Sequence, residues 1–127
     1  MNHPPGILII DDSSYIRMSA SRMLKDLGYR DVDTADDGKS GLDKFRTSHP
    51  HLVILDGVLP ELDGLAVLRL IKKERPETKV IITSSLSARE RIVEFKEAGA
   101  NFYLLKPYSR EKFNEVITHA IAIKEGQ

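Results

Sequence analysis

Carboxylate, hydroxyl and lysine side chains recur directly after the short apolar runs of this chain. Three carboxylates brought together would repel one another and raise their own pKa values unless a cation lay between them. Mg²⁺ is the natural candidate, because it prefers oxygen ligands and needs only a few carboxylates together with a phosphate oxygen. A lysine opposite the metal would supply the second positive charge that a phosphoryl group requires. The residues in question are Asp11, Asp12, Asp56, Thr83, Ser84, Ser85 and Lys106, which is followed by Pro107.

Each of these residues has an ordinary explanation when it is taken singly. Asp12 or Ser13 could cap a helix, and an Asp or Lys after a strand is commonly solvated. Their combination favours a functional site, because acids, hydroxyls and a lysine would all converge on one rim if the apolar runs were neighbouring parallel strands.

The apolar runs predict five strands. Three of them are continuous rather than alternating in hydrophobicity, which is typical of strands buried on both faces of a parallel sheet, and the runs at 31–35 and 101–105 are weaker. The longest is too short to span a bilayer. The predicted strands are residues 7–10, 31–35, 52–55, 80–82 and 101–105.

Segments with helical spacing separate the predicted strands. Gly28 and Gly99 stand where the first and fourth helices would end, and Pro50 and Pro76 follow the second and third. A fifth apolar stripe covers residues 113–121. Strict alternation of strand and helix predicts an α/β fold, with a doubly wound parallel sheet, right-handed crossovers and chemistry at the carboxyl ends of the strands.

Composition narrows the class of protein. The length of 127 residues fits one domain, and 41% hydrophobic with 30% charged residues is ordinary for a globular chain. The lack of cysteine and of a signal-like N-terminus predicts a cytoplasmic protein without disulfides. Because Lys plus Arg and Asp plus Glu both number 19, we expect neither direct nucleic-acid binding nor a membrane partner.

Three rival sites have weak support. Residues 38–40 (Gly-Lys-Ser) look like the end of a phosphate-binding loop, but the first glycine of that motif would stand at Asp33. An aspartyl phosphatase would commonly have a second Asp two residues after Asp56, where this chain has Val58. A metal site from the two histidines that flank Pro50, at positions 49 and 51, is also poorly supported.

Taken together, the residues resemble the receiver domains of bacterial two-component signalling. The spacings of 44 positions from Asp12 to Asp56, 28 to Ser84 and a further 22 to Lys106 are similar to those of single-domain chemotaxis receivers. The resemblance implies one receiver domain over residues 1–127, with its core at about 7–123 and a flavodoxin-like (βα)5 fold of five strands and five helices. The matching motifs are Asp11-Asp12, Asp56, Leu59-Pro60, Asp63-Gly64, Ser84, Tyr103 and Lys106-Pro107.

The resemblance also implies roles. Asp56 would be the nucleophile and phosphoacceptor, and Ser84 and Lys106 would each bind a phosphate oxygen. Tyr103 would be the aromatic residue whose rotamer reports phosphorylation, although a half-buried strand aromatic with no signalling role is equally compatible with the sequence. Pro107 would follow a cis peptide bond. The ligands of Mg²⁺, the implied cofactor, would be Asp11, Asp12, Asp56 and the backbone carbonyl of Val58.

The implied function is a phosphorylation switch rather than a conventional enzyme. A sensor histidine kinase or a histidine phosphotransfer protein would donate the phosphoryl group, and the face of the fourth helix, fifth strand and fifth helix would then change. The changed face would bind a downstream protein or a covalently linked output domain. A homodimer that forms on phosphorylation is a further option. The alternative is a pseudo-receiver, which binds proteins without being phosphorylated.

One departure from the family pattern and two apolar positions near the site carry expectations of their own. Gly57 follows the acceptor where an apolar side chain is usual, and glycine is expected to loosen the strand end there. Val58 and Leu86 are apolar at positions that overlook the path of water to the phosphoryl group in receiver domains. They predict a long-lived phosphorylated form, unless Leu86 packs into the junction with the fourth helix.

Overall fold

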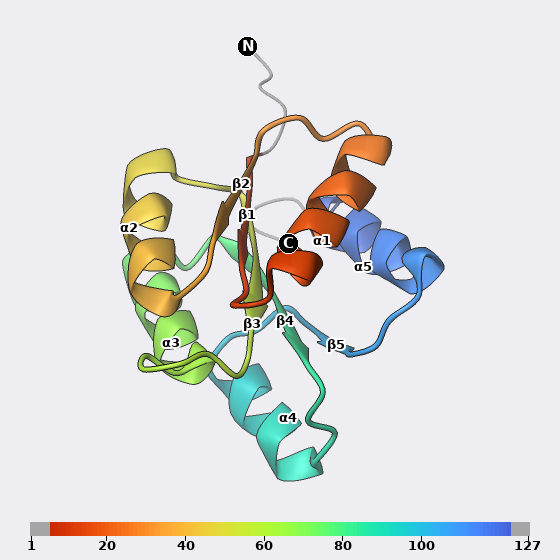
Figure 1. The fold of residues 1–127 in the computed structure, drawn as a ribbon. Coiled ribbons are helices and arrows are strands. Elements are labelled where there is room, and N and C mark those ends of the chain that lie inside the picture. Colours follow the sequence, from red (N-terminus) through yellow and green to blue (C-terminus); the bar gives the residue numbers. More distant parts are fainter. Residues whose placement is uncertain (1–5, 123–127) are drawn as a thin grey trace.

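The computed structural model describes residues 6–122, in which five strands alternate with five helices (Figure 1). Residue 123, the expected end of the core, and the tail at 124–127 lie outside the described residues. The strands are β1 (Ile7–Ile10), β2 (Val32–Ala35), β3 (Leu52–Asp56), β4 (Lys79–Ser84) and β5 (Phe102–Leu105). The helices are α1 (Ser14–Asp26), α2 (Gly38–Ser48), α3 (Gly64–Glu74), α4 (Arg89–Glu97) and α5 (Arg110–Ala122).

All strand pairs in the sheet are parallel, and the strand order is β2-β1-β3-β4-β5. The predicted doubly wound (βα)5 architecture is therefore confirmed. The register brings the strand ends level, with Asp56 opposite Thr83 and Ser84 opposite Leu105. The polar residues that follow the strands thus meet at a single edge of the sheet.

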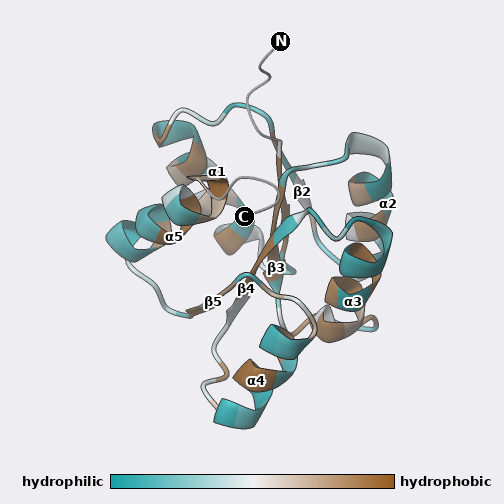
Figure 2. Cartoon of the chain, turned by 180° about the vertical axis from the view of Figure 1, so that it is seen from behind, coloured by the Kyte–Doolittle hydropathy of each residue, from teal (hydrophilic) through white to brown (hydrophobic). Residues whose placement is uncertain are grey.

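The sheet is buried on both faces by helices. α1 and α5 cover one face, and α2, α3 and α4 cover the other (Figures 1 and 2). Successive side chains of β1 supply both cores, because Ile7 and Ile9 face α1 and α5 whereas Leu8 and Ile10 face the other helices. This explains why the strands read as continuous apolar runs instead of alternating ones.

The helix ends follow the residues that the sequence singled out. Ser13 caps α1 by accepting a hydrogen bond of 3.2 Å from the N–H of Ile16. Gly28 and Gly99, which follow α1 and α4, have φ values of 99° and 108°, in the left-handed region that favours glycine. His49, the residue that follows α2 and precedes Pro50, is also left-handed, with a φ of 50°.

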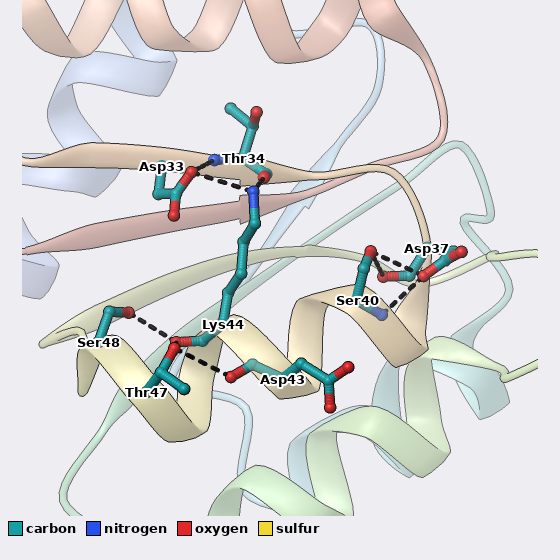
Figure 3. A network of polar contacts seen from close by, with 8 residues as sticks. All are labelled: Asp33, Thr34, Asp37, Ser40, Asp43, Lys44, Thr47 and Ser48. Carbon is teal, nitrogen blue, oxygen red and sulfur yellow. Dashed lines mark hydrogen bonds and ion pairs between the residues drawn. The ribbon is translucent and has the colours of Figure 1, made fainter.

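Polar contacts fix α2 against β2 (Figure 3). The carboxylate of Asp37 accepts hydrogen bonds from the backbone N–H and the hydroxyl of Ser40, and these bonds lower the pKa of Asp37. The ammonium group of Lys44 reaches Asp33 at 3.2 Å and the carbonyl oxygen of Thr34. Residues 38–40 therefore form a capped helix start, which agrees with the rejection of a phosphate-binding loop.

Of the helices described here, none is long and apolar enough to cross a membrane.

Candidate functional site

Three carboxylates meet at the carboxyl edge of the sheet. Asp11 and Asp12 follow β1 directly, and Asp56 is the last residue of β3. One oxygen from each of the three side chains lies within 4.8 Å of the others. Asp11 and Asp56 are 1% and 5% exposed, whereas Asp12 is open to solvent. Within residues 6–122 this is the one group of three or more acidic, histidine or cysteine side chains close enough to hold a metal ion.

Asp11 is fixed by bonds to both of its carboxylate oxygens. Oδ1 accepts a hydrogen bond of 2.9 Å from the N–H of Ser13, and Oδ2 lies 2.9 Å from Nζ of Lys106. Its backbone carbonyl also accepts a hydrogen bond of 2.8 Å from Arg17. These charged and backbone donors compensate the carboxylate for the water that it loses on burial.

Asp56 is less completely paired. Its Oδ1 accepts a hydrogen bond of 3.0 Å from the N–H of Val58, and Oδ2 lies 3.5 Å from Nζ of Lys106. Burial raises the pKa of Asp56, and the hydrogen bond from Val58 and the charge of Lys106 oppose this only in part. The site therefore favours a further positive charge beside Asp56.

Lys106 reaches the site from the end of β5. Its backbone N–H donates to the carbonyl oxygen of Ser84 at 2.8 Å, which aligns the end of β5 with that of β4. Although burial alone would lower the pKa of Lys106, its hydrogen bond to Asp11 and the negative charges of Asp56 and Asp11 raise it. The peptide bond between Lys106 and Pro107 is cis, as the resemblance to receiver domains implied.

Ser84 and Tyr103 are joined through the backbone of Leu86. Ser84 is buried, and its Oγ accepts a hydrogen bond of 3.0 Å from the N–H of Leu86. The hydroxyl of Tyr103 donates to the carbonyl oxygen of the same residue at 2.8 Å. Tyr103 is half-buried, with its ring centroid 5.8 Å from that of Phe95. The loop after β4 thus connects the edge of the site to the face formed by α4 and β5.

The donor set fits Mg²⁺. Carboxylate oxygens are the hard ligands that this ion prefers, and the exposed Asp12 leaves room for the waters that Mg²⁺ usually keeps. Asp11, Asp12 and Asp56 would hold the ion. The backbone carbonyl of Val58, the fourth expected ligand, remains a prediction. The two histidines next to Pro50 are not part of a metal-binding group, and Nδ1 of His51 accepts a hydrogen bond from the N–H of Gly6.

Two exposed apolar side chains of α1, which the sequence pattern did not single out, lie near Lys106. Tyr15 and Met18, on the outer face of α1, are 75% and 74% exposed. They line a hollow of about 670 Å³ between α1 and the segment from Lys106 to Arg110. Their spacing of three residues, off the buried stripe of α1, is the signal that could have identified them.

Gly57 is more tightly packed than the sequence suggested. It is buried, and its N–H donates a hydrogen bond of 2.9 Å to the carbonyl oxygen of Thr83. A Cβ atom at this position would lie 3.1 Å from the ring of Phe95 and 3.3 Å from Ile82. α4 therefore fills the space that a side chain at position 57 would occupy, and the expected loosening of the strand end stays a prediction.

The fold and this rim define a doubly wound α/β domain whose site is suited to binding a cation and a phosphoryl group together. The model of the response regulator receiver domain family matches residues 7–118. The chain therefore belongs to the receiver domain family of two-component response regulators, for which a phosphorylation switch is the general function.

Individual relatives support this assignment. Chemotaxis protein CheY of Bacillus subtilis is 29% identical over 115 residues, which cover 91% of this chain and 96% of that protein. A probable transcriptional regulator of Galdieria sulphuraria is 41% identical over 103 residues, which cover 81% of this chain but 40% of that protein. The crystal structure of a CheY-like receiver domain protein from Methanospirillum hungatei JF-1 has a TM-score of 0.87 and 31% identity, and the match covers 92% of this chain and 93% of that one.

Proposed function

We propose that this chain is a cytoplasmic phosphorylation switch that accepts a phosphoryl group on Asp56. One observation carries the proposal: Nζ of Lys106 lies 2.9 Å from Asp11 and 3.5 Å from Asp56, beside three carboxylates that converge within 4.8 Å. The positive charge of Lys106 is thus fixed next to a carboxylate whose pKa is raised by burial. An arriving phosphoryl group would meet both the nucleophile and the lysine.

The transfer requires little covalent chemistry from the protein. The P–N bond of a phosphohistidine donor breaks as an oxygen of the Asp56 carboxylate forms a bond to phosphorus, and the histidine nitrogen keeps the electron pair. Lys106 would bind an equatorial phosphoryl oxygen, and the hydroxyl of Ser84 would donate to another. Mg²⁺, held by the three carboxylates, would supply further positive charge to those oxygens. Positioning and electrostatics account for most of the catalysis.

The product is an acyl phosphate, which the same site can remove. A water oxygen forms a bond to phosphorus as the bond from phosphorus to the Asp56 oxygen breaks, so that inorganic phosphate leaves and the carboxylate is restored. The switch would thus reset without a second protein, and its lifetime would depend on how easily water reaches the phosphorus.

The hollow beside α1 suits the phosphodonor. Tyr15 and Met18 offer apolar surface in a hollow that Lys106 also lines, together with Arg22 and Arg110. A helix that carries a phosphohistidine could bury its apolar side chains here while its phosphate met Lys106. We assign this surface to a sensor histidine kinase or a histidine phosphotransfer protein.

Output would follow from the link between Ser84 and Tyr103. If Ser84 turned its hydroxyl to a phosphate oxygen, Leu86 would lose the acceptor for its N–H, and its contact with Tyr103 would change. The face of α4, β5 and α5 would then favour a different partner. That partner would be a downstream protein, a covalently linked output domain or a second copy of the chain.

The test is intact-mass analysis after incubation with acetyl phosphate or phosphoramidate and Mg²⁺. The wild type should gain one phosphoryl group, and Asp56→Asn should gain none. Asp36→Asn is the matched control, since Asp36 is an exposed acid that follows β2 at the same edge of the sheet. Failure to label the wild type under these conditions would support the pseudo-receiver instead, and labelling of Asp56→Asn would show that the acceptor lies elsewhere.

A further inference from the structure

The feature that favours glycine at position 57 is the close packing around it and not its backbone conformation. Its φ lies outside the left-handed region that Gly28 and Gly99 occupy, so an L side chain could adopt the same backbone conformation. A Cβ atom would nevertheless lie 3.1 Å from Cζ of Phe95 and 3.3 Å from Cγ2 of Ile82. The ring of Phe95 therefore takes the place of a side chain on the residue next to the acceptor.

Phe95 is the anchor of α4. It is fully buried, and it is the only buried residue of that helix. Besides Gly57, its ring meets Tyr103, at 5.8 Å between centroids, and the guanidinium group of Arg91, which lies 5.1 Å from the ring centroid. Arg91 also pairs at 3.3 Å with Asp63, the residue that precedes α3. The ring of Phe95 thus packs against Gly57 at the end of β3 and against Tyr103 of β5. It also packs against Arg91, whose ion pair with Asp63 joins α4 to the start of α3.

The backbone beside this ring orients the acceptor carboxylate. The N–H of Gly57 donates to Thr83 at 2.9 Å, and the N–H of Val58 donates to Oδ1 of Asp56 at 3.0 Å. Both bonds depend on the position of the two peptide groups that follow Asp56. A ring packed against Gly57 limits the movement of those groups, because close-packed interiors transmit small displacements.

We infer that Phe95 is a positioning residue for phosphoryl transfer, which holds the backbone after Asp56 from the side of α4. This inference rests on the proposed function, because it concerns Asp56 as the acceptor. It adds a direct contact between the acceptor loop and α4, separate from the connection that runs through Ser84, Leu86 and Tyr103. A shift of α4 would alter the acceptor site, and occupation of that site would alter the packing of α4 by an equal coupling free energy.

The experiment is a double-mutant cycle with Phe95→Ala, Gly57→Met and the pair of substitutions together. Phe95→Ala empties the space beside position 57, and Gly57→Met alone forces a side chain into a space that the ring already fills. The combined variant can fill the gap again from the strand side, since an unbranched methionine adapts to irregular cavities. Phe45→Ala is the matched control. Phe45 is a fully buried phenylalanine in the same core, in the last turns of α2.

The first readout is hydrogen exchange of the backbone amides of Gly57 and Val58, followed by NMR without any phosphodonor. The second is the rate at which acetyl phosphate labels Asp56. We expect Phe95→Ala and Gly57→Met each to speed exchange and to slow labelling by about tenfold, with most of both effects restored in the pair. Phe45→Ala should change neither, whatever it does to the melting temperature.

Two results would overturn the inference: identical behaviour of Phe95→Ala and Phe45→Ala, or a pair of substitutions whose effects simply add. Should Phe95→Ala fail to fold, the cycle is run with Phe95→Leu, which keeps the residue apolar but removes the ring. A wild type that takes no phosphoryl group refutes the proposed function itself, and in that case the amide exchange still decides whether Phe95 positions the loop.

Discussion

The hydroxyl of Tyr103 donates a hydrogen bond of 2.8 Å to the carbonyl oxygen of Leu86. The N–H of the same residue donates to Oγ of Ser84 at 3.0 Å. The backbone N–H and carbonyl of Leu86 therefore bond to Ser84, at the carboxyl edge of the sheet, and to the half-buried Tyr103 of β5. A change at either partner alters the conformation that the loop after β4 prefers.

The first prediction concerns the hydrogen bond from the hydroxyl of Tyr103 to Leu86. Tyr103→Phe should lower the free energy of unfolding by about 1 kcal/mol or less, as is usual for one partly solvated hydrogen bond. It should also uncouple the loop after β4 from phosphorylation, so that NMR shifts of Leu86 on phosphorylation no longer extend to β5. Tyr15→Phe, at an exposed ring, is the control for stability. Wild-type propagation of the shifts in Tyr103→Phe would rule out a signalling role for this hydroxyl.

The second prediction concerns the metal. Asp12→Ala should weaken Mg²⁺ binding at least about tenfold, because even the outer partners of metal ligands commonly have effects of that size. Asp12 is the exposed member of the cluster, so its loss should leave the core intact. Titration calorimetry measures the affinity, and Asp36→Ala removes the same charge from the same edge of the sheet as a control. Equal affinities in both variants would place the ion elsewhere.

The third prediction concerns stability and pH. Since burial raises the pKa of Asp56 above 3.8, the folded state binds this proton more readily than the unfolded state does. The resulting stabilisation is fully present below the unfolded pKa and is lost as the pH rises through the folded pKa. Without Mg²⁺, Asp56→Asn should therefore melt above wild type at neutral pH, and the difference should shrink as the pH approaches 3.8.

With Mg²⁺, the wild type should instead melt above Asp56→Asn, because the ion binds the folded wild type more tightly than a variant that lacks one carboxylate. Thermal denaturation with and without the ion, over a series of pH values, tests both statements. A lower melting temperature for Asp56→Asn at neutral pH without Mg²⁺ would show that this carboxylate supports the fold, contrary to the proposal.

The fourth prediction concerns the lifetime of the acyl phosphate. Val58 and Leu86 are 51% and 40% exposed, and they follow Asp56 and Ser84 by two positions each. Exposed apolar side chains there offer no hydrogen bond to an attacking water, so hydrolysis should be slow. The double variant Val58→Asn, Leu86→Glu should lose phosphate faster than wild type when decay is followed by intact mass. Unchanged decay would mean that these side chains do not control access of water.

Much of the fold could be predicted from local sequence. The apolar runs located the strands to within a residue or two, because strands buried on both faces need continuous hydrophobicity. The last strand begins at Phe102 instead of Asn101, because the Asn101 side chain accepts a hydrogen bond of 2.8 Å from the N–H of Val80. A side chain that replaces a backbone partner leaves no mark in hydrophobic periodicity.

The site could be predicted in part, for a related reason. Parallel strands end at a common edge, so the chain order of Asp11, Asp12 and Asp56 was enough to bring them together. The closer pairing of Lys106 with Asp11 than with Asp56 depends on how the loop after β5 folds back. The contact of Phe95 with Gly57 depends on the packing of a helix against a strand far away in the sequence. Neither contact is encoded by spacing.

The attachment of α4 by a single fully buried ring has a thermodynamic consequence. α3, on the same face of the sheet, buries five of its residues, whereas α4 buries Phe95 alone. Because the free energy of local opening follows the apolar contact that is lost, α4 should detach at a smaller cost than α3 does. In a ranking of the helices on this face by the free energy of sub-global unfolding, α4 would come lowest, so the native ensemble would contain a minor population in which the sheet keeps its strands while α4 is released.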